Sequence, residues 1–107
     1  MSLIKLDLSP ETIQSLALED LTTRYDSHVE QAQALMMKKN HDYGEAWRYM
    51  RISSLTDLIL MKLLRIRQIE DNEGKTLISE GLDANYIDII NYSIFALIRL
   101  REQTRKS

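Results

Sequence analysis

The residue best placed to do chemistry is Asp88, because it stands inside the otherwise apolar stretch Tyr86–Leu100. A carboxylate is rarely buried without a partner, since removing its charge from water is costly. Asn91 and Tyr92 follow three and four residues later, so all three side chains share one face of a helix. This polar stripe predicts either a metal or substrate site or a hydrogen-bond network that fixes helix register. We favour the site, because a carboxylate is a costly way to fix register.

Four further residues could serve such a site. Asp57 and Glu80 are the acidic candidates, although Asp57 could equally be a helix cap. On one helix, Glu80 would lie about 12 Å along the axis from Asp88, which is far for ligands that each bind Mg²⁺ at about 2.1 Å. Lys62 and Arg65 are neighbours on a helix face. We interpret that pair as a solvated face, with a phosphate clamp as the alternative.

Aromatic side chains next to the first glycine after the N-terminal helical pattern offer another possibility. The segment 39–44 contains turn-forming residues and predicts a loop, and Tyr43 and Trp47 lie at and after its end. These two rings could stack on a nucleobase. Packing in the core or at an interface is the commoner fate of such residues.

The elements that must position these residues are helices. Ser9, Pro10 and Glu11 form a helix start, and apolar residues then recur at steps of three and four as far as Met36. We expect one long helix or two shorter ones there, a short helical turn over 45–50, and a capping box at 54–57. That box would open a helix ending near residue 70. The last helix should begin between residues 79 and 84 and end near 103. This predicts an all-α fold, a bundle of three or four helices forming one domain over residues 1–107.

Composition excludes several classes of protein. The chain has no Cys and two His, so disulfides, thiolate zinc sites and Cys nucleophiles are ruled out. Three Gly and one Pro are too few for the many tight turns of an all-β fold. A net charge of −2 gives no electrostatic reason to expect nucleic-acid binding. We find no signal peptide and no apolar run long enough to span a membrane, so we expect a cytoplasmic protein. The last helix is apolar nearly all round, which predicts that it also packs against another subunit, giving a dimer or tetramer.

Three blocks of the sequence resemble a known family. The run KNHDYGEAW, residues 39–47, is similar to the K-N-x-D-Y-G-x-A-W signature of a small bacterial and phage family, nucleotide-modification-associated domain 1. The stretch 54–66 resembles its second block. The run DIINY, residues 88–92, resembles its third block, which an acidic residue precedes at the position of Glu80. The first block is the most specific of the three.

That family is similar in helical pattern to the all-α nucleotide pyrophosphohydrolases of the MazG and dimeric dUTPase kind. The resemblance implies an oligomeric bundle in which carboxylates hold Mg²⁺ or Mn²⁺ and a nucleoside triphosphate is cleaved to the monophosphate and pyrophosphate. It implies Asp88 as a metal ligand, helped by Glu80 and Asp57. Lys62 and Arg65 would face the phosphates. The remaining substrate-binding positions would be Asn91, Tyr92, Asp42, Tyr43 and Trp47.

The carboxylate set departs from the pyrophosphohydrolase pattern. The first acidic residue of their E-x-x-D motif falls on Asn85, and the preceding helix supplies Asp57 and then Met61 one turn later. Two functions therefore stay open. The first is an Mg²⁺-dependent nucleoside triphosphate pyrophosphohydrolase acting on standard or modified nucleotides. The second is a non-catalytic helical module that binds a nucleotide or a protein and carries a degenerate metal site.

Overall fold

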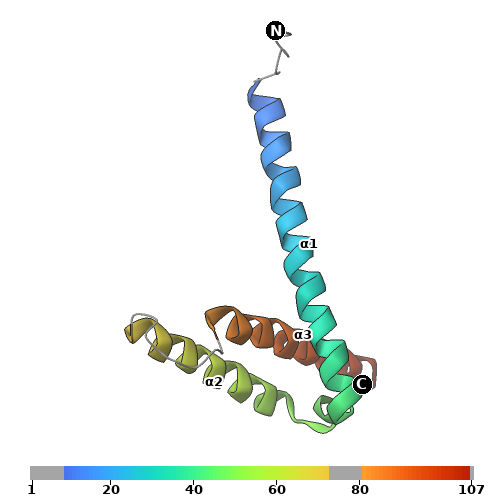
Figure 1. The fold of residues 1–107 in the computed structure, drawn as a ribbon. Coiled ribbons are helices and arrows are strands. Elements are labelled where there is room, and N and C mark those ends of the chain that lie inside the picture. The colour runs from blue at the N-terminus through green and yellow to red at the C-terminus, as the bar shows by residue number, and fades with distance from the viewer. Residues whose placement is uncertain (1–8, 73–80, 107) are drawn as a thin grey trace. The chain divides into compact units, whose positions relative to one another are not determined.

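The computed structural model describes residues 9–72 and 81–106, and these form an all-α fold without strands. Helix α1 spans Pro10–Tyr43, α2 spans Ile52–Asp71 and α3 spans Leu82–Lys106 (Figure 1). A short 3-10 helix, η1, spans Ala46–Tyr49 between α1 and α2. The predicted fold class is confirmed, with three α-helices in the described ranges. The predicted assembly into an oligomer stays a prediction.

The chain divides into two compact units, residues 1–30 and 31–107. In the described part of the first unit, the predicted helix start is confirmed. The backbone N–H of Thr12 donates to Ser9 Oγ over 3.3 Å, and that of Ile13 donates to the Ser9 carbonyl over 3.0 Å. Ser9 thus satisfies amides that have no partner inside the helix, while Pro10 has no amide hydrogen to satisfy.

The predicted loop over residues 39–44 is wrong, because α1 continues to Tyr43. The helix ends at Gly44, whose φ of +69° favours glycine, and the Gly44 amide donates to the Asn40 carbonyl over 2.9 Å. A left-handed glycine after the last helical residue is a common way to stop a helix. The turn-forming residues that precede Gly44 therefore lie inside the last turn of α1. Within that turn, Asn40 Nδ2 lies 3.2 Å from Met36 Sδ. The short helical turn predicted next is confirmed as η1.

The predicted capping box is also wrong. Helix α2 begins three residues earlier, at Ile52, and its N-cap residue Arg51 makes no side-chain capping bond. The Arg51 carbonyl instead accepts from the amides of Ser54 and Leu55, over 3.0 and 3.2 Å. Leu55 is completely buried, so packing of this first turn, rather than a cap, fixes where the helix begins.

The other predicted boundaries are close to the observed ones. Helix α2 ends at Asp71, one residue beyond the expected end. Helix α3 begins at Leu82, inside the predicted window, and runs to Lys106, three residues beyond its predicted end. A loop is also predicted over residues 71–74, of which Asp71 still belongs to α2 and residues 73 and 74 lie outside the described residues.

The core of the second unit forms where α2 and α3 pack along each other. Its buried apolar residues come from every helix of the unit: Ala32 from α1, Trp47 from η1, Leu55, Ile66 and Ile69 from α2, and Ile87 from α3. Three polar side chains are buried with them, and all three lie on α3: Asn85, Asp88 and Asn91. Buried polar groups require partners. The site is therefore defined by what these α3 side chains contact.

Candidate functional site

One face of α3 carries a line of side chains that reach the other elements. Asp88, Asn91, Phe95, Arg99 and Glu102 are spaced by three, four, four and three residues, which keeps them on a single face of the helix. The polar stripe that the sequence indicated at Asp88 and Asn91 is thus the first part of a longer one. Its members meet partners that come from the carboxyl-terminal part of α1, from η1 and from α2.

Asp88 binds two lysines from two different helices. Its Oδ1 accepts from Lys39 Nζ of α1 over 2.9 Å, and its Oδ2 accepts from Lys62 Nζ of α2, also over 2.9 Å. The Asp88 side chain is 12% exposed, whereas Lys39 is 48% exposed and Lys62 is 26% exposed. We call these three residues the lysine–aspartate cluster. It joins three helices and carries one net positive charge.

The charge state of Asp88 follows from this geometry. Burial raises the pKa of Asp88, because the carboxylate loses water. The hydrogen bonds and the positive charges of Lys62 and Lys39 outweigh that effect, so the pKa lies below its usual range. The carboxylate is therefore ionised at neutral pH, and both of its oxygens face an ammonium group.

Asn91 ties two helices together. Its Nδ2 donates to the backbone carbonyl of Ala32 on α1 over 3.0 Å, and both residues are buried. This is the register-fixing network that the sequence offered as the alternative interpretation of the stripe. Asn85 acts more locally, donating to the Gly81 carbonyl over 3.2 Å. Tyr92, the other predicted substrate-side residue, is half-buried.

Trp47 packs in the core against α3. Its ring stacks on Phe95 with 4.5 Å between centroids and 5° between the planes, and the Arg48 guanidinium carbon lies 4.6 Å from the indole centroid. These are the contacts of an aromatic residue packed in the core, which is the commoner role of such residues. Its predicted contribution to a nucleoside pocket stays a prediction. The Trp47 Nε1–H is buried and has no acceptor among the described residues.

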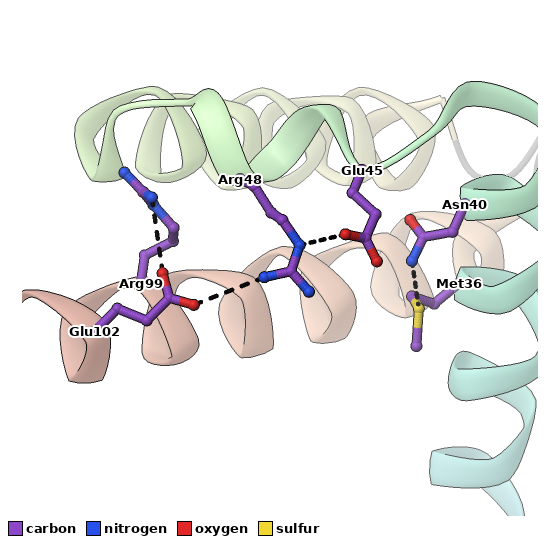
Figure 2. Close-up of polar contacts among 6 residues, drawn as sticks. All are labelled: Met36, Asn40, Glu45, Arg48, Arg99 and Glu102. Atoms are coloured by element: carbon purple, nitrogen blue, oxygen red, sulfur yellow. Dashed lines mark hydrogen bonds and ion pairs between the residues drawn. The ribbon is translucent and has the colours of Figure 1, made fainter.

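A chain of ion pairs also joins η1 to α3. Arg48 pairs with Glu45 at the start of η1 and reaches Glu102 over 3.7 Å, and Arg99 reaches the other oxygen of Glu102 over 3.8 Å (Figure 2). Exposed pairs of this kind contribute little energy one by one. Together with the stack of Trp47 on Phe95, these ion pairs hold η1 against α3. In the chain, η1 comes directly after α1, the helix that carries Lys39.

The other predicted site residues lie on α1 or α2 or outside the described residues. Arg65 lies one turn after Lys62 and is half-buried, and Asp57 is exposed on α2. Glu80 lies outside the described residues. Asp42 and Tyr43 belong to the last turn of α1, but their side chains lie outside what the structure describes.

The predicted Mg²⁺ site falls only partly within the described residues. They contain no group of three or more His, Cys, Asp or Glu side chains arranged to bind a metal ion. Asp88 is a suitable hard oxygen ligand, but both of its oxygens are engaged by ammonium groups. The prediction that Asp88, Asp57 and Glu80 bind metal stays untested, since Glu80 is not described.

Sequence reasoning missed Lys39. Its partner Asp88 is 49 residues away in the sequence, and helical spacing does not report such a contact. A usable signal was present, because Lys39 is the first residue of the most specific block of the sequence. Its pairing with Asp88 links the first block to the third.

A family model described as nucleotide modification associated domain 1 matches residues 39–100. That range contains the whole lysine–aspartate cluster and the stack of Trp47 on Phe95. No curated protein and no solved structure matches the chain. No helix in the described ranges is long and apolar enough to cross a membrane.

Proposed function

The chain belongs to the nucleotide modification associated domain 1 family, and from that premise we propose that it binds nucleotides, with their phosphates held at the lysine–aspartate cluster. The observation that carries this proposal is the pairing of two ammonium groups with one carboxylate. The cluster keeps a net positive charge, and both lysines remain partly exposed. An anion can therefore reach them.

The hydrogen-bonding capacity of the cluster also supports an anionic ligand. Each ammonium group has three N–H donors, and Asp88 accepts one from each lysine. The remaining donors can serve phosphate oxygens without breaking either ion pair. Lysine binds phosphate as a compact point charge on a long side chain, and it is a common phosphate ligand in proteins.

The fold supplies the rigidity that such a site needs. Lys39 and Lys62 come from different helices, and Asp88 holds both ammonium groups within hydrogen-bonding distance of one carboxylate. Their positions are therefore largely set before a ligand arrives, which lowers the entropy lost on binding. Asn91 and the stack of Trp47 on Phe95 contribute by fastening α1 and η1 to α3.

A second candidate function is the Mg²⁺-dependent hydrolysis of a standard or modified nucleoside triphosphate to the monophosphate and pyrophosphate. The observation that favours it is the ionised Asp88 carboxylate beside two cations. Mg²⁺ often binds to one or two carboxylates together with substrate phosphates, and it would offset charge and lower the pKa of a bound water. The described residues supply a single carboxylate at the cluster, so we rank this function below metal-free binding.

Calorimetric titration of a nucleoside triphosphate in EDTA tests the proposal. Lys39→Met and Lys62→Met each remove one charge and keep a long side chain, and each should weaken binding about fivefold or more. Lys38→Met is the matched control, because Lys38 is exposed and appears in none of the ion pairs found within residues 9–72 and 81–106. Equal affinities for all four proteins would overturn the assignment of the site.

A turnover assay separates the two functions. The protein is incubated with standard and modified nucleoside triphosphates in Mg²⁺, Mn²⁺ or EDTA, and the products are resolved by ion-exchange chromatography. Monophosphate plus pyrophosphate that disappears in EDTA and in Asp88→Asn establishes the hydrolase. Binding in EDTA with no product under any condition establishes the binding module.

A further inference from the structure

Residues 10–30 of α1 carry a stripe of exposed apolar side chains. Leu18, Leu21, Tyr25 and Val29 recur at steps of three and four, and all four are exposed, Tyr25 by 68%. Single exposed apolar residues are ordinary on a protein surface. A continuous stripe along a helix marks a face that packs against something. These residues precede the part of the chain that the family model matches.

Helix α3 carries a second stripe of exposed apolar side chains. Tyr86, Ile94, Leu97 and Ile98 are exposed, and half-buried Ile90 completes the row. This row lies about 120° around the helix from the face that holds Asp88. Among the described residues, the packing of α3 therefore leaves this row exposed.

The two stripes match in length and differ in charge. Leu18–Val29 extends about 17 Å along its helix, and Tyr86–Ile98 extends about 18 Å. Residues 10–30 contain five acidic residues and one basic residue, whereas residues 99–106 contain four basic residues and one acidic residue. Arg101 and Arg105 follow Leu97 at steps of four, so they extend the α3 stripe towards its carboxyl end, and both are exposed.

We propose that the occupant of each stripe is a second copy of this chain. Residues 10–30 of one copy lie antiparallel along the α3 stripe of the other copy, and the reciprocal contact closes a twofold dimer. The antiparallel direction places Glu11 and Glu19 near Arg101 and Arg105 of the second copy. It also sets the positive amino end of one helix dipole against the negative carboxyl end of the other. A twofold dimer makes this contact twice, which uses both stripes of both copies.

This inference does not depend on nucleotide binding. It makes the chain's own acidic and basic segments the two halves of one interface. It also explains why α3 is apolar nearly all round, since one face packs in the core and another packs against the second copy.

Light scattering after size-exclusion chromatography tests the dimer with the full chain. We expect a dimer at micromolar concentrations, and Leu21→Lys or Leu97→Lys should raise its dissociation constant at least tenfold. Leu60→Lys is the matched control, because Leu60 is an exposed leucine of α2 that lies outside both stripes, and it should leave the dimer unchanged. Circular dichroism confirms that each variant is folded.

Charge reversal tests the pairing of the stripes and its direction. One variant combines Glu11→Lys with Glu19→Lys, and the other combines Arg101→Glu with Arg105→Glu. Each variant alone should dissociate, and an equimolar mixture should recover the dimer, because both contacts of the mixed dimer again join opposite charges. A monomeric wild type at 100 µM, or a mixture no tighter than the separate variants, would overturn the proposal. A dimer that responds to only one of the two reversals would assign the contact to a single stripe packing on its own copy and would equally refute it.

Discussion

Replacing Asp88 by Asn should weaken the fold and strengthen metal-free phosphate binding at the same time. Asn keeps the size of the side chain and removes its charge. Lys39 and Lys62 then lose the carboxylate that each contacts at 2.9 Å, and their positive charges are no longer offset. A residue that served only to fix helix register would change stability and leave anion affinity as it was.

Both magnitudes follow from the geometry of the cluster. The carboxylate is nearly buried and the lysines are partly exposed. The loss of stability therefore falls between that of an exposed pair and that of a buried pair, about 1–2 kcal/mol. A phosphate bound on the outer side of an ammonium group lies about 6 Å from the carboxylate, and at an effective dielectric constant near 60 removing that repulsion contributes about 1 kcal/mol. Affinity should thus rise about fivefold.

Two measurements on the same protein check this prediction. Urea unfolding of wild type and Asp88→Asn gives the change in stability, and calorimetric titration with a nucleoside triphosphate in EDTA gives the change in affinity. Asp57→Asn is the matched control, because Asp57 is an exposed carboxylate of α2. It should change neither quantity by a comparable amount. The reasoning is refuted if Asp88→Asn binds the triphosphate more weakly than wild type, since the ordering of the two lysines by Asp88 would then outweigh its charge repulsion of the phosphate.

Three further outcomes are expected. Because the pKa of Asp88 is lowered in the fold, its stabilising effect is complete above the unfolded value of about 3.9 and is lost as pH falls through the folded value; the stability gap between wild type and Asp88→Asn, measured in urea at several pH values, should therefore close below about pH 4. Trp47→Ala removes the stack on Phe95 and should cost about 3–4 kcal/mol by thermal unfolding, a loss far below 1 kcal/mol meaning that the ring does not pack in the core. Gly44→Ala should cost about 1 kcal/mol in the same assay because of the positive φ alone, since a Cβ there meets nothing within 4 Å; a neutral result would contradict the left-handed conformation.

The sequence predicted the helices well and their ends less well. Apolar spacing identified all three helices, and Ser9 with Pro10 located the start of α1, because these signals are local. The end of α1 was missed because its last turn is rich in residues that also form turns, and Gly44 alone terminates it. The start of α2 was missed because burial of Leu55 fixes it. Burial depends on the other helices, and the local sequence does not contain that information.

The site was only half predictable for the same reason. Asp88 stood out because a charge inside an apolar helix is anomalous in any fold. The lysines that pair with Asp88 come from other helices, and helical periodicity does not predict which cations will lie beside it. Lys62 entered the argument as a possible phosphate ligand, and its pairing with Asp88 was not foreseen. Asn91 followed the more ordinary interpretation of the polar stripe, as a bond between helices.

In the proposed function, the lysine–aspartate cluster binds the phosphates of a nucleotide without a metal ion. The most direct test is a calorimetric titration of the unaltered chain, in EDTA and low salt, with a nucleoside triphosphate and with the matching unphosphorylated nucleoside. We expect saturable binding of the triphosphate that weakens as salt is added, and no detectable binding of the nucleoside. Binding of the nucleoside as tight as that of the triphosphate, or no binding of the triphosphate, would contradict the proposed function.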